Sequence, residues 1–184
     1  MRFFLFTIAS FFTLTAFGQS PIDSGFTNKA EAKNQYKDSL KDGKWIEYRS
    51  DTIKEHNWVL KSYTLVIYKQ GKRNSIARKY SMNGVLDEKS YYTNGLLNGT
   101  KIEYRSDGKV YSEEEYTEGK KNGLSKIYFR NGNVEWETPY INNKKNGVEK
   151  HYYESGKLWM ETTFHNGVMG EVKRYDENGN EIKK

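Results

Sequence analysis

The 184-residue sequence contains no cysteine and only two prolines. Without cysteine the chain can form neither disulfides nor thiolate metal sites, and it has no thiol nucleophile and no lipoprotein-type anchor. Hydrophobic residues make up 35% of the sequence, and the mean hydropathy is −0.95. This is too little aliphatic side chain for a thick two-layer core, while the 15% of aromatic residues is too high for a disordered chain. The composition fits a single-layer sheet held by tyrosine and tryptophan on its faces.

The sequence also lacks the motifs of common enzyme classes. It contains no HExxH, GxSxG, P-loop or dinucleotide-binding fingerprint. Its three histidines, His56, His151 and His165, fall at unrelated positions of the repeat described next. The only run of carboxylates, residues 113–115, would alternate between the two faces of a strand and so cannot present a convergent pair. We therefore expect a protein that is not an enzyme, with no catalytic residues, no cofactor and no metal site.

A 24-residue repeat organises most of the chain. The stretch GLLNGTKIEYRSDGKVYSEEEYTE (95 to 118) returns as GKKNGLSKIYFRNGNVEWETPYIN (119 to 142), and the frame continues upstream over 71–94 and downstream over 143–166. A fixed period of this length indicates a repeat architecture. Further repeats are expected to begin near residues 39 and 167, which gives a repeat domain over 39–184. The first repeat is eight residues longer than the others.

Each repeat contains two runs of β-forming residues separated by a short glycine-containing turn. These turns hold Asn83-Gly84, Asp107-Gly108, Asn131-Gly132, Ser155-Gly156 and Asn178-Gly179. Asn-Gly and Asp-Gly tolerate positive φ at both central residues, so the pattern predicts type I′ hairpin tips. A longer turn, such as 118–122, is expected to join each hairpin to the next. The predicted fold class is all-β, a single-layer twisted antiparallel meander built from 24-residue β-hairpin repeats.

Pairing the strands across the tip turns predicts their register. In that register the aromatic residue near the end of each second strand lies opposite a glycine that opens the first strand. The aromatic residues are Tyr92, Tyr116, Tyr140 and Phe164, and the glycines are Gly99, Gly123 and Gly147. A ring over each bare glycine would restore buried surface. The same register places Lys126 and Lys150 on rungs with Glu113, Glu137 and Glu161, as cross-strand ion pairs.

The first eighteen residues differ from the rest. Arg2 precedes an apolar run from Phe3 to Phe17, with small residues at positions −3 and −1 of a cleavage site before Gln19. This pattern is typical of a secretory signal peptide over 1–18. The run is shorter than the ~20 residues that a spanning helix needs, although an uncleaved anchor is the alternative. We expect an exported mature chain, periplasmic or extracellular, with no transmembrane segment after cleavage.

Three further segments depart from the repeat. Residues 19–38 are expected to form a polar leader followed by an edge strand over 32–37, with a helix from Asn28 to Leu40 as the alternative. The insertion in the first repeat carries His56 and Trp58, and it could form either a longer hairpin or a binding loop. The charged end of the chain, Asn180 to Lys184, is expected to form a strand that caps the sheet.

Basic pairs recur at one position of the repeat, in the expected inter-hairpin turns. They are Lys72-Arg73, Lys120-Lys121 and Lys144-Lys145. With strands ~4.8 Å apart, equivalent turns would lie ~10 Å apart along one edge of the sheet. Such a basic edge could bind anionic lipid, a cell-wall polymer or an acidic protein, or it could simply keep the turns solvated. Nucleic acid is not an expected partner of an exported protein.

Large aromatic residues could also form a binding surface. Tyr111, Trp136 and Trp159 could stack on sugars, but in a single-layer sheet such rings are expected to be the core.

The repeat resembles the bacterial variant of MORN repeats. The resemblance is carried by NGTKIEYRSDGKVYSEEEYTEG (98 to 119) and NGVEKHYYESGKLWMETTFHNG (146 to 167), and it extends over roughly 39–180. It implies hairpin repeats without catalytic residues that scaffold proteins or bind phospholipid. Bacterial chains of this type are often assigned as the antitoxin of a YwqK-like toxin–antitoxin system. We expect a protein-binding or scaffold surface, of which an antitoxin or immunity-type partner is a narrower version. A cell-envelope ligand binder using the basic edge is the alternative.

Overall fold

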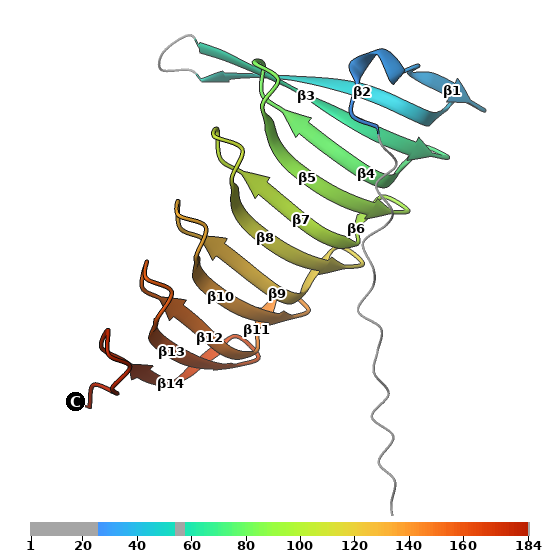
Figure 1. Ribbon diagram of the computed structural model, residues 1–184. Helices are drawn as coiled ribbons and strands as arrows, with labels where there is room; N and C mark the ends of the chain where they lie inside the picture. The colour runs from blue at the N-terminus through green and yellow to red at the C-terminus, as the bar shows by residue number, and fades with distance from the viewer. Residues whose placement is uncertain (1–25, 54–57, 184) are drawn as a thin grey trace, which may run out of the picture.

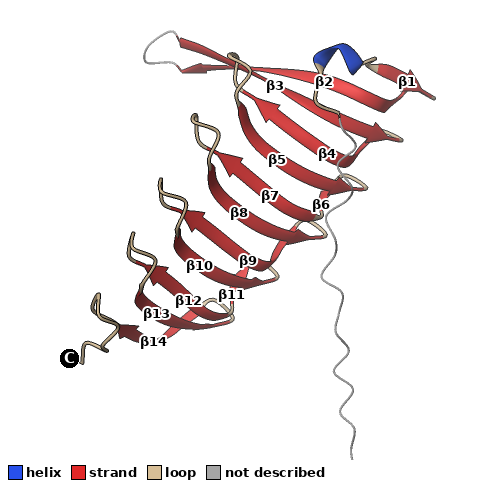
Figure 2. Ribbon diagram, in the orientation of Figure 1, coloured by secondary structure: helices blue, strands red, loops and turns tan. Residues whose placement is uncertain are grey.

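The computed structural model describes residues 26–53 and 58–183. Over these residues the chain forms one antiparallel sheet of fourteen strands and a single short 3-10 helix, η1 (Lys29–Glu31) (Figure 2). The strands are β1 (Gln35–Lys37), β2 (Leu40–Ile53), β3 (Trp58–Lys69), β4 (Lys72–Tyr80), β5 (Leu86–Thr93), β6 (Leu96–Leu97), β7 (Gly99–Tyr104), β8 (Val110–Thr117), β9 (Lys120–Tyr128), β10 (Val134–Ile141), β11 (Lys144–Lys145), β12 (Gly147–Tyr152), β13 (Leu158–His165) and β14 (Val168–Arg174).

The strands lie in the sheet in the order of the sequence. Only the short β6 and β11 leave this path, and they pair with β5 and β10. Figure 1 shows the hairpins side by side in one twisted layer, without a second layer over either face among the described residues. The predicted single-layer meander is confirmed. The helical alternative for 28–40 is wrong, because η1 ends at Glu31 and the chain then enters β1.

The hairpin tips are three-residue loops rather than the predicted type I′ turns. In the first, the Gly84 amide donates to the Ser81 carbonyl (3.1 Å), and the Ser81 amide donates to the Val85 carbonyl (2.9 Å). Gly84 has a φ of +80°, whereas Asn83 does not have positive φ. This is a type I turn followed by a left-handed glycine. Asn-Gly suits both turn types, because only the glycine must be left-handed in the observed one.

The type I′ turns lie at the opposite edge, between hairpins. Both central residues have positive φ in Gln70-Gly71, Asn94-Gly95, Glu118-Gly119, Asn142-Asn143 and Asn166-Gly167. The residues on either side pair directly, as Thr117 does with Lys120. The longer turn predicted over 118–122 is therefore wrong. Because two residues complete the turn, the basic pairs lie in the strands that follow it.

The predicted strand register is confirmed. Tyr116 pairs with Gly99, Tyr140 with Gly123 and Phe164 with Gly147. The predicted ring over the glycine is wrong, because a Cβ built on Gly123 would lie 2.9 Å from the Glu115 Cβ. The Glu115 carboxylate fills that space and accepts a hydrogen bond from the Leu124 amide (2.9 Å).

One face of the sheet, which we name the ladder face, carries alternating charges along its middle. Lys126 pairs across the strands with Glu113 and Glu137, and Lys150 with Glu137 and Glu161. The Lys126 ammonium lies 3.4 Å from the Glu137 carboxylate, and the Lys150 ammonium lies 4.0 Å from that of Glu161. Partly buried cross-strand pairs of this kind stabilise a sheet that lacks an aliphatic core.

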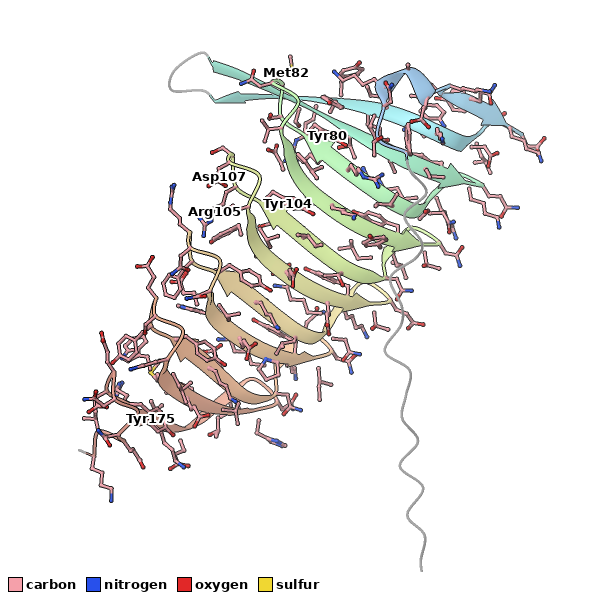
Figure 3. All side chains as sticks on the ribbon, viewed as in Figure 1. Tyr80, Met82, Tyr104, Arg105, Asp107 and Tyr175 are labelled. Atoms are coloured by element: carbon pink, nitrogen blue, oxygen red, sulfur yellow. The ribbon has the colours of Figure 1, made fainter. Side chains whose placement is uncertain are left out.

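A tyrosine column runs beside these charges on the ladder face. The hydroxyls of Tyr128, Tyr152 and Tyr175 each donate a 2.9 Å hydrogen bond to a ladder glutamate of the preceding hairpin. Tyr80 and Tyr104 hold the same position of earlier repeats, and Figure 3 labels them with Tyr175 near the hairpin tips. The repeat thus links each hairpin to the next by one ring and one charged hydrogen bond.

Apolar packing is concentrated at the N-terminal end. Phe26 is fully buried on the ladder face with Tyr63 and Leu65, and the Arg78 guanidinium donates to the Phe26 carbonyl (2.6 Å). This end of the polar leader therefore packs on the sheet. On the opposite face, which we name the groove face, the buried apolar residues are Trp45, Val66 and Ala77.

The two chain ends differ from the expectation or lie outside the described residues. The predicted C-terminal strand is reduced to one bridge between Tyr175 and Glu181. The predicted signal peptide over 1–18 lies outside the described residues. No helix in the described part of the chain has the length and apolar character needed to cross a membrane.

Candidate functional site

The basic pairs are divided between two environments, because neighbouring strand residues point to opposite faces. Their second members, Arg73, Lys121 and Lys145, lie on the groove face beside carboxylates. The Arg73 guanidinium is 2.8 Å from Glu47, Lys121 pairs with Glu114, and Lys145 pairs with Glu149. Each of these cations also lies over the ring near the end of the second strand of its own hairpin, at 5.4 Å from Tyr92, 5.3 Å from Tyr140 and 4.7 Å from Phe164. These three side chains are held in place by their neighbours.

The first members, Lys72, Lys120 and Lys144, are exposed at the turn edge. The Cβ of Lys72 lies 3.6 Å from the point that a Cβ on Gly95 would occupy. The Cβ of Lys144 lies 4.0 Å from the equivalent point on Gly167. Apolar residues occupy the equivalent place in other repeats: Leu96 is 51% exposed and Val168 is 72% exposed. The structure therefore brings three exposed lysines to this edge, with Leu96 between Lys72 and Lys120 and with Val168 after Lys144.

The insertion in the first repeat lengthens the β2–β3 hairpin. Pairing of the two strands continues to Ile53 and Trp58. His56 lies outside the described residues, and for Trp58 only the backbone is described. The longer hairpin agrees with one of the two alternatives, while the binding-loop alternative stays a prediction.

A cavity of about 640 Å³ opens on the groove face over β2–β5. Its floor contains Thr64, Ala77 and Ser90, of which the last two are each 2% exposed. Charged residues surround this floor: Lys41, Glu47, Arg49, Arg73, Lys79 and Glu88. Sequence reasoning missed this site. Its signal was present in the repeat, since Ala77 and Ser90 stand where the next copy has Lys101 and Glu114.

Hydrogen bonds hold the charged rim in place. The Glu47 carboxylate accepts from the Lys41 ammonium (2.7 Å), the Tyr68 hydroxyl (2.7 Å) and the Arg73 guanidinium (2.8 Å). Burial alone would raise the pKa of Glu47, but these three donors together hold it below its ordinary value. Burial would lower the pKa of Arg73, yet its bonds with Tyr68 and Glu47 raise it instead. Glu47 and Arg73 are therefore both charged at neutral pH.

The cavity carries an excess of positive charge. Lys41, Arg73 and Lys79 face two carboxylates there, Glu47 and Glu88. Three minus two leaves a formal charge of +1, and Arg49, which also lines the cavity, has an interaction of its own. Such a site attracts anionic groups, and it also offers carboxylates and hydroxyls as hydrogen-bond acceptors.

A second cluster lies further along the groove face, over β10–β13. His151 is 6% exposed, and its ring lies 4.3 Å from that of Trp136 at 15° and 5.9 Å from that of Trp159 at 50°. Its Nε2 is 3.1 Å from the Glu149 carboxylate. His151 covers one face of Trp136, yet Tyr111, Trp136 and Trp159 are each 39% exposed. The expectation that these rings form the buried core is wrong, because a single-layer sheet leaves part of each ring uncovered. Among the described residues no group of histidines and carboxylates could hold a metal ion.

Comparison with known proteins identifies the repeat unit. Residues 121–142 and 145–166 match the MORN repeat variant family. These segments cover β10, β12 and β13 and nearly all of β9. No curated protein matches the chain significantly. The family match supports the MORN-variant resemblance and does not extend to the antitoxin assignment. Over these two consecutive hairpins, the chain is similar to MORN repeat variants.

Proposed function

We propose that the protein is a non-catalytic binding module that offers the uncovered faces of its sheet to a protein partner. The observation that carries this proposal is the single-layer architecture, in which a groove with a fixed charged rim stays open on one face. MORN repeats are generally modules that bind proteins or membranes. A long, regular sheet with two open faces suits the first of these roles.

The ordered side chains support this role. Cations on the groove face are held by carboxylates and rings, and the ladder face is held by tyrosine–glutamate bonds. A surface whose side chains are fixed before binding loses little conformational entropy when a partner arrives. Pre-organisation of this kind favours recognition of a particular protein surface over loose association.

The second candidate is a cell-envelope ligand bound at the turn edge. It is supported by the exposure of Lys72, Lys120 and Lys144 along one side of the sheet. Arg73, Lys121 and Lys145 weaken it, because their charges are balanced by glutamates on the groove face. An anionic lipid or cell-wall polymer would thus meet three exposed cations instead of six. We therefore rank the protein partner first.

Both candidates place the mature chain outside the cytoplasm, in the periplasm or beyond it. The support is the charged start followed by the apolar run from Phe3 to Phe17. Mass spectrometry of the protein from its native cells should find a chain that begins at Gln19. A chain that begins at Met1 would contradict export by cleavage. An antitoxin or immunity-type partner is the narrower form of the proposal, for a toxin that acts outside the cytoplasm.

Site-specific photocrosslinking tests the binding surface. A photoreactive residue is placed at Thr64 or Ser125 on the groove face, and at Thr100 or Thr163 on the ladder face. The chain from Gln19 onward is then exposed to an extract of its native cells. We expect one discrete protein to crosslink from one face, and an excess of unmodified chain to remove the product.

The alternative is tested in parallel with anionic vesicles and isolated cell wall. The matched variant is Lys72→Ser, Lys120→Ser and Lys144→Ser together. Salt-sensitive retention that this variant loses, combined with the absence of any crosslinked protein, would contradict the protein-binding proposal and favour the envelope ligand.

A further inference from the structure

We infer that the cavity over β2–β5 receives the carboxylate side chains of an acidic, extended segment of the protein partner. This inference rests on the proposed function, and it names the site and the chemistry of the contact. It starts from a local excess of positive charge at the cavity wall.

The Glu47 cluster has one carboxylate for two cations. Lys41 and Arg73 share that single acceptor, at 2.7 and 2.8 Å. The next cluster along the groove face has the opposite imbalance, since Lys101 lies 3.5 Å from Glu88 and 2.6 Å from Glu103. The N-terminal cluster therefore carries one surplus positive charge at the cavity wall.

Lys79 is a further cation at the cavity wall. It pairs in backbone register with Glu88, but the Glu88 carboxylate instead lies near Lys101 and accepts from the Ser90 hydroxyl (3.1 Å). Lys79 has no ion pair among the described residues. Its ammonium is thus available at the cavity to a carboxylate supplied from outside.

The distribution of the cations favours an extended segment over a single small anion. Arg73 and Lys79 pair with Tyr68 and Thr64 of β3, which are four residues apart, so about 14 Å of extended strand separates them. A phosphate site requires donors that converge on one point, and these do not. In an extended peptide, alternate side chains point the same way at about 7 Å intervals, so carboxylates two or more residues apart could reach separate cations.

The lining also suits a peptide better than a densely charged polymer. Glu47 and Glu88 would repel closely spaced phosphates, whereas they can accept hydrogen bonds from peptide N–H groups. Ser62, Thr64 and Ser90 add hydroxyls that can donate or accept. The small side chains of Ala77 and Ser90 create the space for a peptide, because the larger Lys101 and Glu114 occupy the same positions in the next repeat.

Fluorescence anisotropy with synthetic peptides tests the inference directly. The probe is a labelled eight-residue peptide of alternating glutamate and threonine, compared with otherwise identical glutamine and lysine peptides. The protein is the chain from Gln19 onward. We expect the glutamate peptide to bind and the other two to bind at least about tenfold more weakly, with a loss of affinity at high salt.

Two variants locate the binding. Lys79→Glu should weaken binding of the glutamate peptide about tenfold, because it removes one surplus cation and adds a repulsive charge. Ala77→Lys should also weaken it, by filling the cavity as Lys101 does in the next repeat. Lys120→Glu, at the exposed turn edge, makes the same charge change away from the cavity and should leave the affinity within about twofold. Circular dichroism verifies the fold of each variant, and Lys79→Glu alone decides if Ala77→Lys does not fold.

The inference is overturned if the glutamine peptide binds equally well, or if Lys79→Glu and Lys120→Glu have equal effects. Displacement of the peptide by millimolar inorganic phosphate would also overturn it and point to a small anion. If no peptide binds while a protein still crosslinks from the sheet, the acidic segment is wrong and the proposed function stands. If the glutamate peptide binds but no cellular protein crosslinks, the cavity does bind acidic peptides, and the proposed function is wrong.

Discussion

The imidazole of His151 lies flat against the indole of Trp136, with ring centroids 4.3 Å apart and an angle of 15° between the planes. The same imidazole is hydrogen-bonded to Glu149, which also accepts from Lys145 and the Thr138 hydroxyl. Burial would raise the pKa of Glu149, but its three donors together lower it. This polar and aromatic cluster replaces the aliphatic core that a single-layer sheet cannot build.

Replacing His151 with alanine should therefore destabilise the fold. We expect the free energy of unfolding in urea to fall by about 2 kcal/mol, because the substitution removes ring packing and leaves Glu149 with one donor fewer. His165 is exposed on the neighbouring strand and provides the matched control. His165→Ala should change stability by less than about 0.5 kcal/mol. Equal losses for the two variants would show that the cluster does not stabilise the sheet.

Reversing the charge of Lys126 should break the charge ladder. Lys126→Glu places a third carboxylate between Glu113 and Glu137, so we expect a loss of about 1–2 kcal/mol in chemical denaturation. Lys121 is not a neutral control, since it pairs with Glu114 and lies over Tyr140. Lys120→Glu is suitable, because Lys120 is exposed and has no ion pair among the described residues. A loss of unfolding free energy for Lys126→Glu no larger than that of the control would refute a stabilising role for the ladder.

Glu118 occupies a left-handed position that its side chain disfavours. It has a φ of 51° at the first central position of a type I′ turn, where three of the other four inter-hairpin turns have asparagine. Glu118→Asn should raise the free energy of unfolding by about 0.5–1 kcal/mol, because asparagine tolerates this conformation better. Glu177→Asn is the control, since Glu177 lies in a tip turn without positive φ. Stabilisation of both variants to the same degree would exclude the turn conformation as the cause.

The repeat frame predicted the strand order and register because both depend on local signals. Strand length, the position of turn glycines and alternation along each strand together left one pairing, in which Tyr140 lies opposite Gly123. The prediction placed the type I′ turns at the hairpin tips, whereas the structure has them between hairpins, and the reason is physical. Asn-Gly is compatible with either turn, and only the pairing of the flanking residues, such as Thr117 with Lys120, distinguishes a two-residue loop from a three-residue one.

The cavity could not be predicted from the repeat consensus, because it arises where the consensus is broken. Ala77 and Ser90 are common residue types. They open a cavity only because larger side chains on the neighbouring strands surround them. The burial of Phe26 was missed for a similar reason. An isolated apolar residue in a polar stretch shows no periodicity, and its partners Tyr63 and Leu65 are distant in the sequence.

Alkaline pH should weaken the tyrosine column. Burial and the hydrogen bond to Glu137 raise the pKa of Tyr152 from 10.0 to about 12. A raised pKa in the folded state means that the neutral hydroxyl is favoured there, so its contribution is complete below pH 10 and is lost as the pH rises towards 12. Lysines also titrate in this range, so the effect must be read as a difference between variants.

The comparison is between the wild-type chain, Tyr152→Phe and Tyr48→Phe, each unfolded in urea at several pH values from 9 to 12. Phenylalanine cannot ionise, so Tyr152→Phe should lose less stability over this range, by about 1 kcal/mol once solvent screening is allowed for. Tyr48 is 71% exposed, and its replacement should leave the wild-type pH dependence unchanged. At pH 7 the order reverses, because Tyr152→Phe lacks the bond to Glu137 and should be the less stable chain. Parallel pH profiles for all three chains would show that the tyrosine–glutamate bonds do not couple the hairpins.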